Sequence, residues 1–347
     1  MSGVSKAIVQ PLLSWYDAGH RDLPWRSEPA PYRVWVSEIM LQQTRVEAVR
    51  GYFSRWMNAL PDIPALAAAD EAVYTKLWEG LGYYSRVRNL HRAAVLLCEE
   101  YGGELPADYD RLLALPGVGE YTAGAVASIA FGLPVPAVDG NVLRVAARLD
   151  NDFTPITDAK FKKQTRERFA ALMPSDRPGD LNQSLMELGA TVCLPNGAPH
   201  CDDCPIQHLC EGFHRGNAAV LPLRAAKKAR RVEKRTVLVV RCGQLVGLRQ
   251  RPKKGLLAGL WELPSLDGHL SPDELRAALT EMGWSVRKLL SLRPAKHIFT
   301  HVEWHMNGVY VELDAPAPAL TFVTPAELRD AYALPSAFRS FVSVLED

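Results

Sequence analysis

The sequence has few cysteines and no long hydrophobic run. Only six cysteines occur among 347 residues, too few for the disulfide framework of a small secreted protein. The longest apolar run, residues 123–138, is broken by one glycine and two prolines and is shorter than a bilayer requires. Residues 1–16 lack the basic region, apolar core and cleavage site of a signal peptide. We therefore expect a cytoplasmic globular protein with no membrane partner.

Excess charge of one sign is also lacking. The net charge of +1 gives no overall signal for nucleic acid. The basic residues instead concentrate in residues 223–235, where a single acid, Glu233, stands among them. The basic residues there are Arg224, Lys227, Lys228, Arg230, Arg231, Lys234 and Arg235. Such a segment between neutral or acidic blocks is typical of a solvated linker, and a DNA-contacting stripe is the alternative.

The chain is too long for one ordinary core, which indicates two domains. Up to residue 222, apolar residues recur at three- and four-residue spacing. This spacing predicts helices over residues 39–53, 65–77, 89–101 and 123–131. After residue 235 the pattern predicts a β-hairpin over 236–249, a helix over 272–282 and a strand over 304–313. We expect an all-α domain, residues 1–222, a basic linker, 223–235, and a smaller α+β domain, 236–347.

Four of the six cysteines are grouped in residues 193–210. Cys193, Cys201, Cys204 and Cys210 have the spacing C-x7-C-x2-C-x5-C. This asymmetry differs from the paired C-x2-C knuckles of structural zinc, and it favours the ligand set of a [4Fe–4S] cluster. Two disulfides are the alternative. The remaining two cysteines lie in apolar stretches and are expected to be buried thiols.

Residues 112–131 predict a helix, a tight turn and a second helix. The turn contains Leu115-Pro-Gly-Val-Gly, in which Gly117 and Gly119 would permit backbone angles that other residues avoid. Free N–H groups at the start of the second helix would then favour a DNA phosphate, although an ordinary αα-hairpin gives the same pattern. Farther along the chain, Asp139 follows an apolar helix and a proline-containing loop. It is either a helix cap or a functional carboxylate.

Together, the turn, Val138-Asp-Gly-Asn-Val and the four cysteines resemble the helix-hairpin-helix DNA glycosylase superfamily. Further stretches resemble its adenine DNA glycosylase (MutY) family, over nearly the whole chain. They are Leu23-Pro-Trp-Arg, Trp35-Val-Ser-Glu-Ile-Met-Leu-Gln-Gln-Thr and Gly80-Leu-Gly-Tyr-Tyr-Ser-Arg-Val-Arg-Asn-Leu. The resemblance implies a [4Fe–4S] cofactor. The sequence departs from the family in having seven residues between Cys193 and Cys201, where six are usual.

The resemblance also implies the catalytic residues. Glu38 would protonate adenine N7 and then activate water, and its apolar surroundings should raise its pKa. Asp139 would stabilise the cationic sugar, a division of labour like that of glycoside hydrolases. Tyr121 and Asn141 match positions that orient this site. The alternative for Glu38 is a surface glutamate on an amphipathic helix.

Other positions match residues that contact DNA in the family. Gln43, Leu81 and Tyr83 would wedge into the duplex while adenine leaves the stack, and Arg26 would contact the extruded base. Their alternative roles are core packing and loop structure. Endonuclease III, a relative with the same fold, uses a lysine nucleophile where this chain has Tyr121. Because a phenol cannot form an imine, we expect a monofunctional hydrolase.

Residues 236–347 resemble the Nudix-like domain of the same family. In the remnant of the Nudix box, Ala277 and Thr280 replace two magnesium-binding acids and Glu281 alone is left, so we expect no hydrolysis by this domain. Phe299, Thr300 and His301 resemble the Phe-Ser-His loop that inspects 8-oxoguanine, with threonine in place of serine.

The sequence therefore predicts a monomeric adenine glycosylase of base excision repair that acts on double-stranded DNA containing A:8-oxoG or A:G mispairs. Three alternatives stay open: a bifunctional glycosylase/lyase for oxidised pyrimidines, a non-catalytic iron–sulfur DNA-binding module and a Nudix phosphohydrolase.

Overall fold

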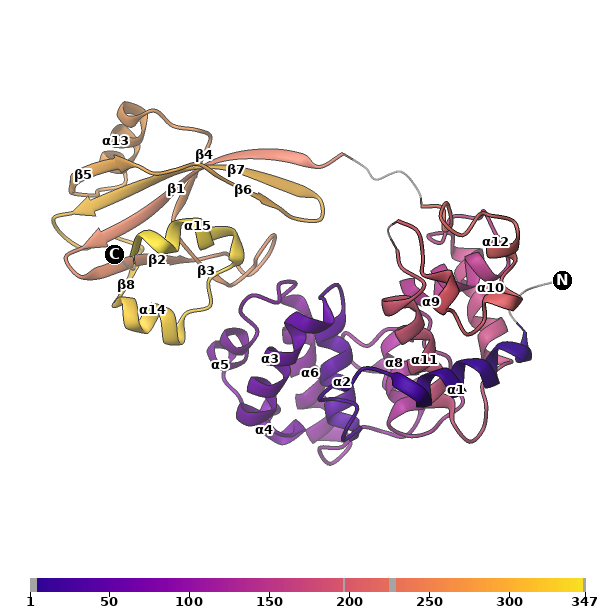
Figure 1. The fold of residues 1–347 in the computed structure, drawn as a ribbon. Coiled ribbons are helices and arrows are strands. Elements are labelled where there is room, and N and C mark those ends of the chain that lie inside the picture. Colours follow the sequence, from indigo (N-terminus) through magenta and orange to yellow (C-terminus); the bar gives the residue numbers. More distant parts are fainter. Residues whose placement is uncertain (1–4, 196, 225–228, 346–347) are drawn as a thin grey trace. The chain divides into compact units, whose positions relative to one another are not determined.

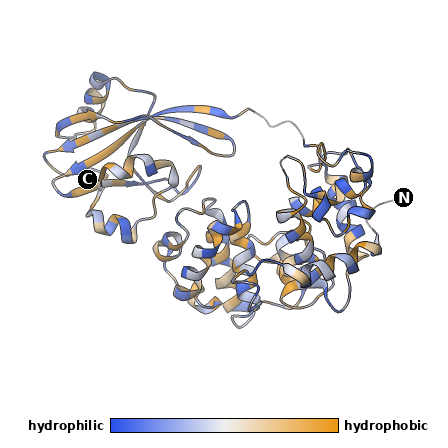
Figure 2. Cartoon of the chain, viewed as in Figure 1, coloured by the Kyte–Doolittle hydropathy of each residue, from blue (hydrophilic) through white to orange (hydrophobic). Residues whose placement is uncertain are grey.

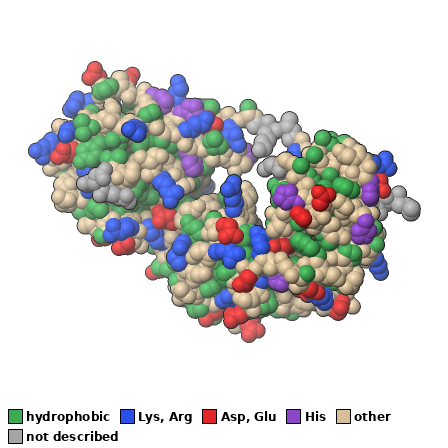
Figure 3. Space-filling view, in the orientation of Figure 1, with side chains coloured by type: hydrophobic (Ala, Val, Ile, Leu, Met, Phe, Trp, Pro, Cys, Tyr) green, Lys and Arg blue, Asp and Glu red, His purple; other side chains and the backbone are tan. Residues whose placement is uncertain are grey.

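The computed structural model describes residues 5–195, 197–224 and 229–345. The chain divides into two compact units: residues 1–68 with 88–226, and residues 69–87 with 227–347. Within the described residues, no helix has the length and apolar character needed to cross a membrane. On the face in Figure 3, Lys and Arg side chains are interspersed with Asp and Glu side chains.

The first unit is helical in its described parts (Figure 1). Its α-helices are α1 (Val9–Gly19), α2 (Pro31–Leu41), α3 (Val46–Ala59), α4 (Ile63–Ala67), most of α6 (Ser85–Glu100), α7 (Tyr109–Ala114), α8 (Glu120–Ile129), α9 (Gly140–Leu149), α10 (Ala159–Ala170), α11 (Pro178–Thr191) and α12 (Glu211–His214). Short 3₁₀ turns lie at Lys6–Ile8, Cys201–Asp203 and Gln207–Leu209. In Figure 2 these helices carry hydrophobic and hydrophilic residues along their length, as amphipathic helices do.

One core of this unit joins α1, α9, α10 and α11. Leu12, Val142, Phe161 and Leu185, one from each helix, are all buried in it. Cys193, Cys204 and Cys210 pack against the same core from the loop that follows α11. The apolar faces of these helices therefore fix the position of the cysteine loop.

Two of the four predicted helices are each divided in the structure. The helix predicted over 39–53 is the end of α2 and the beginning of α3, because Gln43 between them has a φ of 59° that no helix continues. The helix predicted over 65–77 is α4 followed by α5 (Glu71–Leu77), and Asp70 stands at the N-cap of α5. The helices predicted over 89–101 and 123–131 correspond to α6 and α8.

The second unit contains α5 and an eight-stranded sheet. The strands are β1 (Arg231–Cys242), β2 (Leu245–Gln250), β3 (Trp261–Glu262), β4 (Ser265–Asp267), β5 (Val286–Ser291), β6 (Ala295–Ile298), β7 (Val302–Leu313) and β8 (Thr321–Val323). The main order is β3-β2-β1-β7-β5, with β4 on β1, β6 on β7 and β8 on β2. Strands β1 and β7 are parallel and pair from Arg231 with Val302 onward. The predicted hairpin, β1 with β2, and the predicted strand, β7, are thus confirmed.

Helices cover this sheet. They are α13 (Pro272–Glu281), α14 (Pro325–Ala331) and α15 (Arg339–Val342), with 3₁₀ turns at Ser336–Phe338 and Ser343–Leu345. α13 begins with a capping box between Ser271 and Glu274, and it confirms the helix predicted over 272–282. Its Leu275 and Leu279 pack on one core of the sheet, and Phe338 and Phe341 pack on another.

The predicted basic linker is shorter than the sequence suggested. Its last five residues, 231–235, are the beginning of β1 and pair with β7. They continue the sheet because β7 offers an equally long partner strand, which the charge pattern could not reveal. Residues 225–228, with Lys227 and Lys228, lie outside the described residues.

Candidate active site and cysteine loop

Glu38 is a buried carboxylic acid in the first unit. It lies on α2, which begins with Pro31 at a position suited to proline and buries most of its length. Only 4% of Glu38 is exposed, and the Tyr121 hydroxyl donates a hydrogen bond of 2.6 Å to its Oε2. Burial raises the pKa of Glu38 to about 7, and the nearby charge of Asp139 adds to the rise, whereas the Tyr121 hydrogen bond and Arg26 oppose it. Glu38 is therefore partly protonated at neutral pH.

Asp139 is the N-cap residue of α9. Its Oδ1 accepts hydrogen bonds of 2.9 Å from the backbone N–H groups of Asn141 and Val142. Its Oδ2 accepts one of 2.7 Å from the Asn141 side chain. Burial raises the pKa of Asp139, and these hydrogen bonds together with Arg144 oppose the rise. Asp139 therefore caps α9, and this does not prevent it from also serving as a functional carboxylate.

A single cavity of the first unit brings these groups together. It has an empty volume of about 1630 Å³, counting the part open to solvent. The residues expected at the site that line it are Glu38, Tyr121, Asp139, Asn141, Arg26, Gln43, Gly117 and Gly119. Helices α2, α8 and α9 each contribute to this lining, so the candidate catalytic groups come from elements far apart in the sequence.

Arg144 connects the carboxylate end of this cavity with the cysteine loop. Its guanidinium is buried and donates to Asn141 Oδ1 at 2.8 Å, to the Gly189 carbonyl at 2.7 Å and to the Cys193 carbonyl at 2.8 Å. Gly189 is required at this contact because an added Cβ would lie 2.6 Å from the Cβ of Asn141. Asn141 in turn donates to Asp139, so a chain of hydrogen bonds connects the cysteine loop with Asp139.

The helix-hairpin-helix turn is formed by α7 and α8. Gly117 has a φ of +77°, and a Cβ there would lie 2.6 Å from the Cβ of Asn89, so glycine is required twice over. Gly119 differs from the prediction: it is the N-cap of α8 with a φ of −97° and open space around its Cβ position. Gly119 has no side chain that could cap the first N–H groups of α8. Glu120 follows and forms an ion pair with Arg166.

The three residues expected to wedge into DNA have different surroundings. Gln43, in the first unit, has a φ of 59°, and Tyr83, in the second, has a φ of 47° and a side chain that is 46% exposed. Such angles are strained for residues other than glycine, and strain of this kind is found at functional sites. Leu81 is only 6% exposed, so its role in DNA contact stays a prediction that requires the side chain to move.

Phe299, Thr300 and His301 form the turn between β6 and β7 in the second unit. The Phe299 ring packs against Trp304, with 4.9 Å between centroids, and its backbone N–H donates to the Val302 carbonyl. Thr300 and His301 are exposed. The hydroxyls of Thr300 and Tyr83 are hydrogen-bonded at 3.1 Å.

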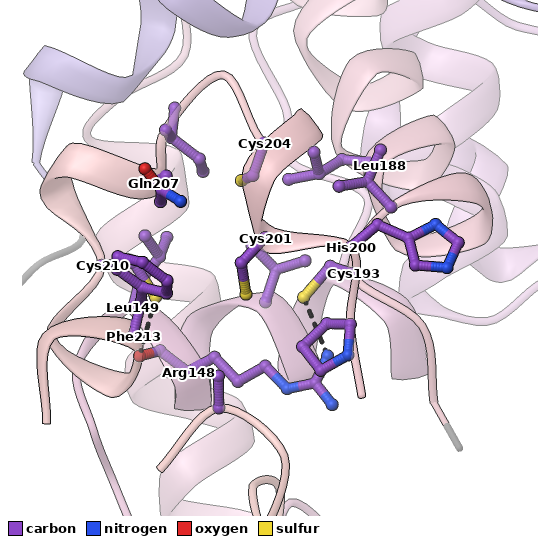
Figure 4. A pocket seen from close by; sticks show the side chains of 15 residues that line it. Arg148, Leu149, Leu188, Cys193, His200, Cys201, Cys204, Gln207, Cys210 and Phe213 are labelled. Carbon is purple, nitrogen blue, oxygen red and sulfur yellow. Dashed lines mark hydrogen bonds between the residues drawn. The ribbon is translucent and has the colours of Figure 1, made fainter. Parts of the chain in front are cut away.

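Cys193, Cys201, Cys204 and Cys210 line one pocket of the first unit (Figure 4). The pocket has an empty volume of about 390 Å³, counting open solvent, and otherwise has mainly apolar walls from α9 and α11. Arg148, 3% exposed, donates from Nη1 to Cys193 Sγ at 3.1 Å and to the Leu194 carbonyl. Four thiols around one apolar space with a guanidinium donor suit a cluster that carries negative charge. Within the described residues, no three His, Cys, Asp or Glu side chains are arranged to hold a single metal ion.

The sequence interpretation missed several residues of the cavity. Gln183, Met186 and Ala190 line it from α11. Glu187, on the same helix, is buried and forms ion pairs with Arg21 and Arg26. A glutamate and a glutamine within the apolar pattern of this helix were the available signal, and such a pattern does not reveal which cavity they face.

Comparison with known proteins agrees with this geometry. Residues 36–172 match the HhH-GPD superfamily of base excision DNA repair proteins, and residues 236–344 match the NUDIX domain. The adenine DNA glycosylase of Mus musculus is 38% identical over 97% of this chain and 77% of its own length. That of Mycolicibacterium smegmatis is 41% identical over 66% of this chain and 79% of its own length.

Solved structures of DNA glycosylases are also similar to the helical part of this chain. A thermostable thymine-DNA glycosylase superimposes with a TM-score of 0.54 and 27% identity, over 60% of this chain and 96% of its own. The superfamily match includes Glu38, Tyr121 and Asp139, and the Mus musculus relative aligns with residues of both units. The chain therefore belongs to the adenine DNA glycosylase family, with a helical HhH-GPD domain followed by a Nudix-like domain.

Proposed function

We propose that this protein removes adenine paired with 8-oxoguanine or guanine from double-stranded DNA by hydrolysing the N-glycosidic bond. The observation that carries the proposal is the hydrogen bond from Tyr121 to Glu38, 2.6 Å long, in a cavity that also contains Asp139. The cavity thus contains a carboxylic acid with a raised pKa and a second carboxyl group. Other hydrolases break glycosidic bonds with such a pair.

Glu38 is the general acid of the proposed reaction. With a pKa of about 7, it holds a proton in a large fraction of molecules at neutral pH. It can pass that proton to adenine N7, which makes the base a neutral leaving group. After the base has left, the Glu38 carboxylate can take a proton from the attacking water.

Asp139 stabilises the positive charge that develops on the sugar. Two backbone N–H groups and the Asn141 amide stabilise its ionised form, and they also prevent rotation of the carboxylate. An oriented charge costs no reorganisation during the reaction, and this favours stabilisation of the transition state.

Tyr121 supports hydrolysis without strand cleavage. Its hydroxyl donates to Glu38, and a phenol has no amine with which to form an imine on the sugar. We therefore expect no covalent adduct with DNA on borohydride treatment. A strong trapped adduct would favour a bifunctional lyase instead.

Contacts with DNA are proposed for both units. The uncapped start of α8, beside Gly117, suits a backbone phosphate. The strained Gln43 and Tyr83 are candidates to fill the space of an extruded adenine. The Thr300 hydroxyl, exposed beside that of Tyr83, can offer a hydrogen bond to the base opposite adenine.

A [4Fe–4S] cluster is the proposed cofactor, with Cys193, Cys201, Cys204 and Cys210 as its ligands. The four thiolates would hold the cluster, and the cluster would join the cysteines to one another. Arg148 donates a hydrogen bond to the sulfur of Cys193, one of the proposed ligands. Arg144 donates to the Cys193 carbonyl and to Asn141, and so links the cysteine loop to Asn141.

Excision on matched duplexes tests the proposed function. Duplexes that differ only in the base opposite adenine, 8-oxoguanine, guanine or thymine, are treated with excess protein and assayed for abasic sites. We expect excision opposite 8-oxoguanine and guanine and none opposite thymine, without strand breaks before alkali. Equal excision from all three duplexes would contradict the proposed role of Thr300, and no excision would contradict the function.

A further inference from the structure

Glu187 is a buried carboxylate that the reaction proposed above does not use. Its side chain is 2% exposed, and it lies on α11 one helical turn after Gln183 and directly after Met186, both of which line the Glu38 cavity. We propose that Glu187 is a positioning residue that holds the Arg26 guanidinium at the wall of this cavity, where it can meet the extruded base. The inference rests on the proposed function of the cavity.

The Glu187 carboxylate accepts hydrogen bonds from two arginines of the segment before α2, Arg21 and Arg26. Its Oε1 accepts from Arg21 Nε at 2.7 Å and from the Arg21 backbone N–H at 3.1 Å. Its Oε2 accepts from Arg21 Nη2 at 3.0 Å and from Arg26 Nη2 at 2.8 Å. Both carboxylate oxygens are thus engaged, and the carboxylate fixes one end of each guanidinium.

Arg26 is fixed from two further sides. Its Nη1 donates to the Arg21 carbonyl at 3.0 Å, and its guanidinium carbon lies 5.5 Å from the centre of the Tyr16 ring. The side chain is 10% exposed, although it lines the cavity. An arginine so held is oriented before a base arrives, and little side-chain entropy is lost when the base binds.

The charge balance also requires Glu187. Two guanidinium groups lie beside one carboxylate, and without it their like charges would face each other with no compensating charge between them. Arg26 would then move toward solvent and leave the cavity wall. A glutamine side chain in place of Glu187 could accept hydrogen bonds but would supply no charge, so Glu187→Gln separates charge from shape.

The test compares single-turnover adenine excision by the full chain and its variants on a duplex with adenine opposite 8-oxoguanine. The variants are Glu187→Gln, Glu187→Asp, Arg26→Gln and the double variant of Glu187→Gln with Arg26→Gln. Asp180→Asn is the matched control, because Asp180 is also on α11 and paired with an arginine, Arg177, but does not line the cavity.

We expect Glu187→Gln to slow excision at least tenfold, on the order of the loss from Arg26→Gln, because a misplaced binding group costs up to about a hundredfold. The double variant should be no slower than either single variant, since both remove the same contact. Glu187→Asp should recover part of the rate, and Asp180→Asn should match the unchanged protein.

Binding to a duplex with an abasic-site analogue separates positioning from a merely structural role. This ligand lacks the base, so Glu187→Gln should bind it with unchanged affinity. Loss of that affinity, a wild-type excision rate in Glu187→Gln, or multiplied losses in the double variant would overturn the proposal. Failure of the unchanged protein to excise adenine would overturn the function itself, which is a different result.

Discussion

Glu38 and Asp139 have the same functional group but different surroundings, which supports the different roles proposed for them. Glu38 accepts a hydrogen bond from the Tyr121 hydroxyl, and burial raises its pKa to about 7. Asp139 is also buried, but two backbone N–H groups and an amide stabilise its charged form. Burial raises the pKa of both carboxyl groups, and hydrogen-bond donors oppose the rise at each: Tyr121 at Glu38, and two backbone N–H groups with the Asn141 amide at Asp139.

Replacement of Glu38, the proposed general acid, tests the roles proposed for the two carboxyl groups. Glu38→Gln keeps the shape of the side chain but cannot transfer a proton, so we expect single-turnover excision to fall about 10²- to 10⁴-fold. Duplex binding, measured in parallel, should be retained. Glu47→Gln on α3, an exposed glutamate, is the control and should leave the rate unchanged. An active Glu38→Gln would favour a non-catalytic role for the cavity.

The pH dependence of excision should report the pKa of Glu38. Because the acid must be protonated, the single-turnover rate should fall as pH rises through about 7. The Tyr121 hydrogen bond stabilises the Glu38 carboxylate and lowers its pKa, so Tyr121→Phe should move this fall to higher pH. A fall that moves to lower pH, or does not move, would contradict the assigned hydrogen bond.

At the scale of the elements, the turn between α7 and α8 requires glycine at Gly117 but not at Gly119, although the motif Leu115-Pro-Gly-Val-Gly contains both. Gly117 combines a positive φ with close contact to Asn89, whereas Gly119 has an ordinary φ and open space. The two glycines of one motif thus have different physical roles: one fixes the turn and the other leaves the start of α8 accessible.

Alanine at each position should separate these roles. Gly117→Ala must adopt a strained φ and displace Asn89, so we expect the free energy of unfolding to fall by about 1–3 kcal/mol and duplex binding to weaken. Gly119→Ala has room for its Cβ and should keep the stability. Thermal unfolding and duplex titration of both variants check this, and equal destabilisation would show that the turn has another conformation.

At the scale of the molecule, Arg144 links the cysteine loop by hydrogen bonds to Asn141, which lines the candidate active-site cavity. One guanidinium joins the Cys193 carbonyl, the Gly189 carbonyl and Asn141. The loop is therefore expected to support the site as well as its own fold, because a displaced Cys193 would release Asn141 and then Asp139.

Removal of one proposed ligand tests that support. Cys201→Ala should reduce iron, inorganic sulfide and the brown colour of the purified protein, and also the yield of folded protein. Cys242→Ala, at the end of β1 and outside the cysteine pocket, should retain all of them. About one zinc ion per chain and no sulfide in the unchanged protein would contradict the assigned cofactor.

Local pattern in the sequence determined the two-part organisation, the hairpin at Leu115–Gly119, the β1–β2 hairpin and the grouping of four cysteines. Spacing and turn residues act over short distances, so these features can be read from the sequence without knowledge of the fold. The resemblance of motifs gave Glu38, Tyr121 and Asp139 their expected roles, and the structure places them in one cavity.

Tertiary structure alone decided the rest. The chain leaves the helical conformation at Gln43, which the apolar spacing did not reveal. Glu187 pairs with Arg21 and Arg26, and Arg144 bonds to the Cys193 carbonyl, because the packing of the helices brings these distant residues together. The pKa of Glu38 also depends on the tertiary structure, because burial and partners such as Tyr121, 83 residues away along the chain, determine it. Side-chain types set the available chemistry, but the distances between them, and so the charges they carry, exist only in the folded protein.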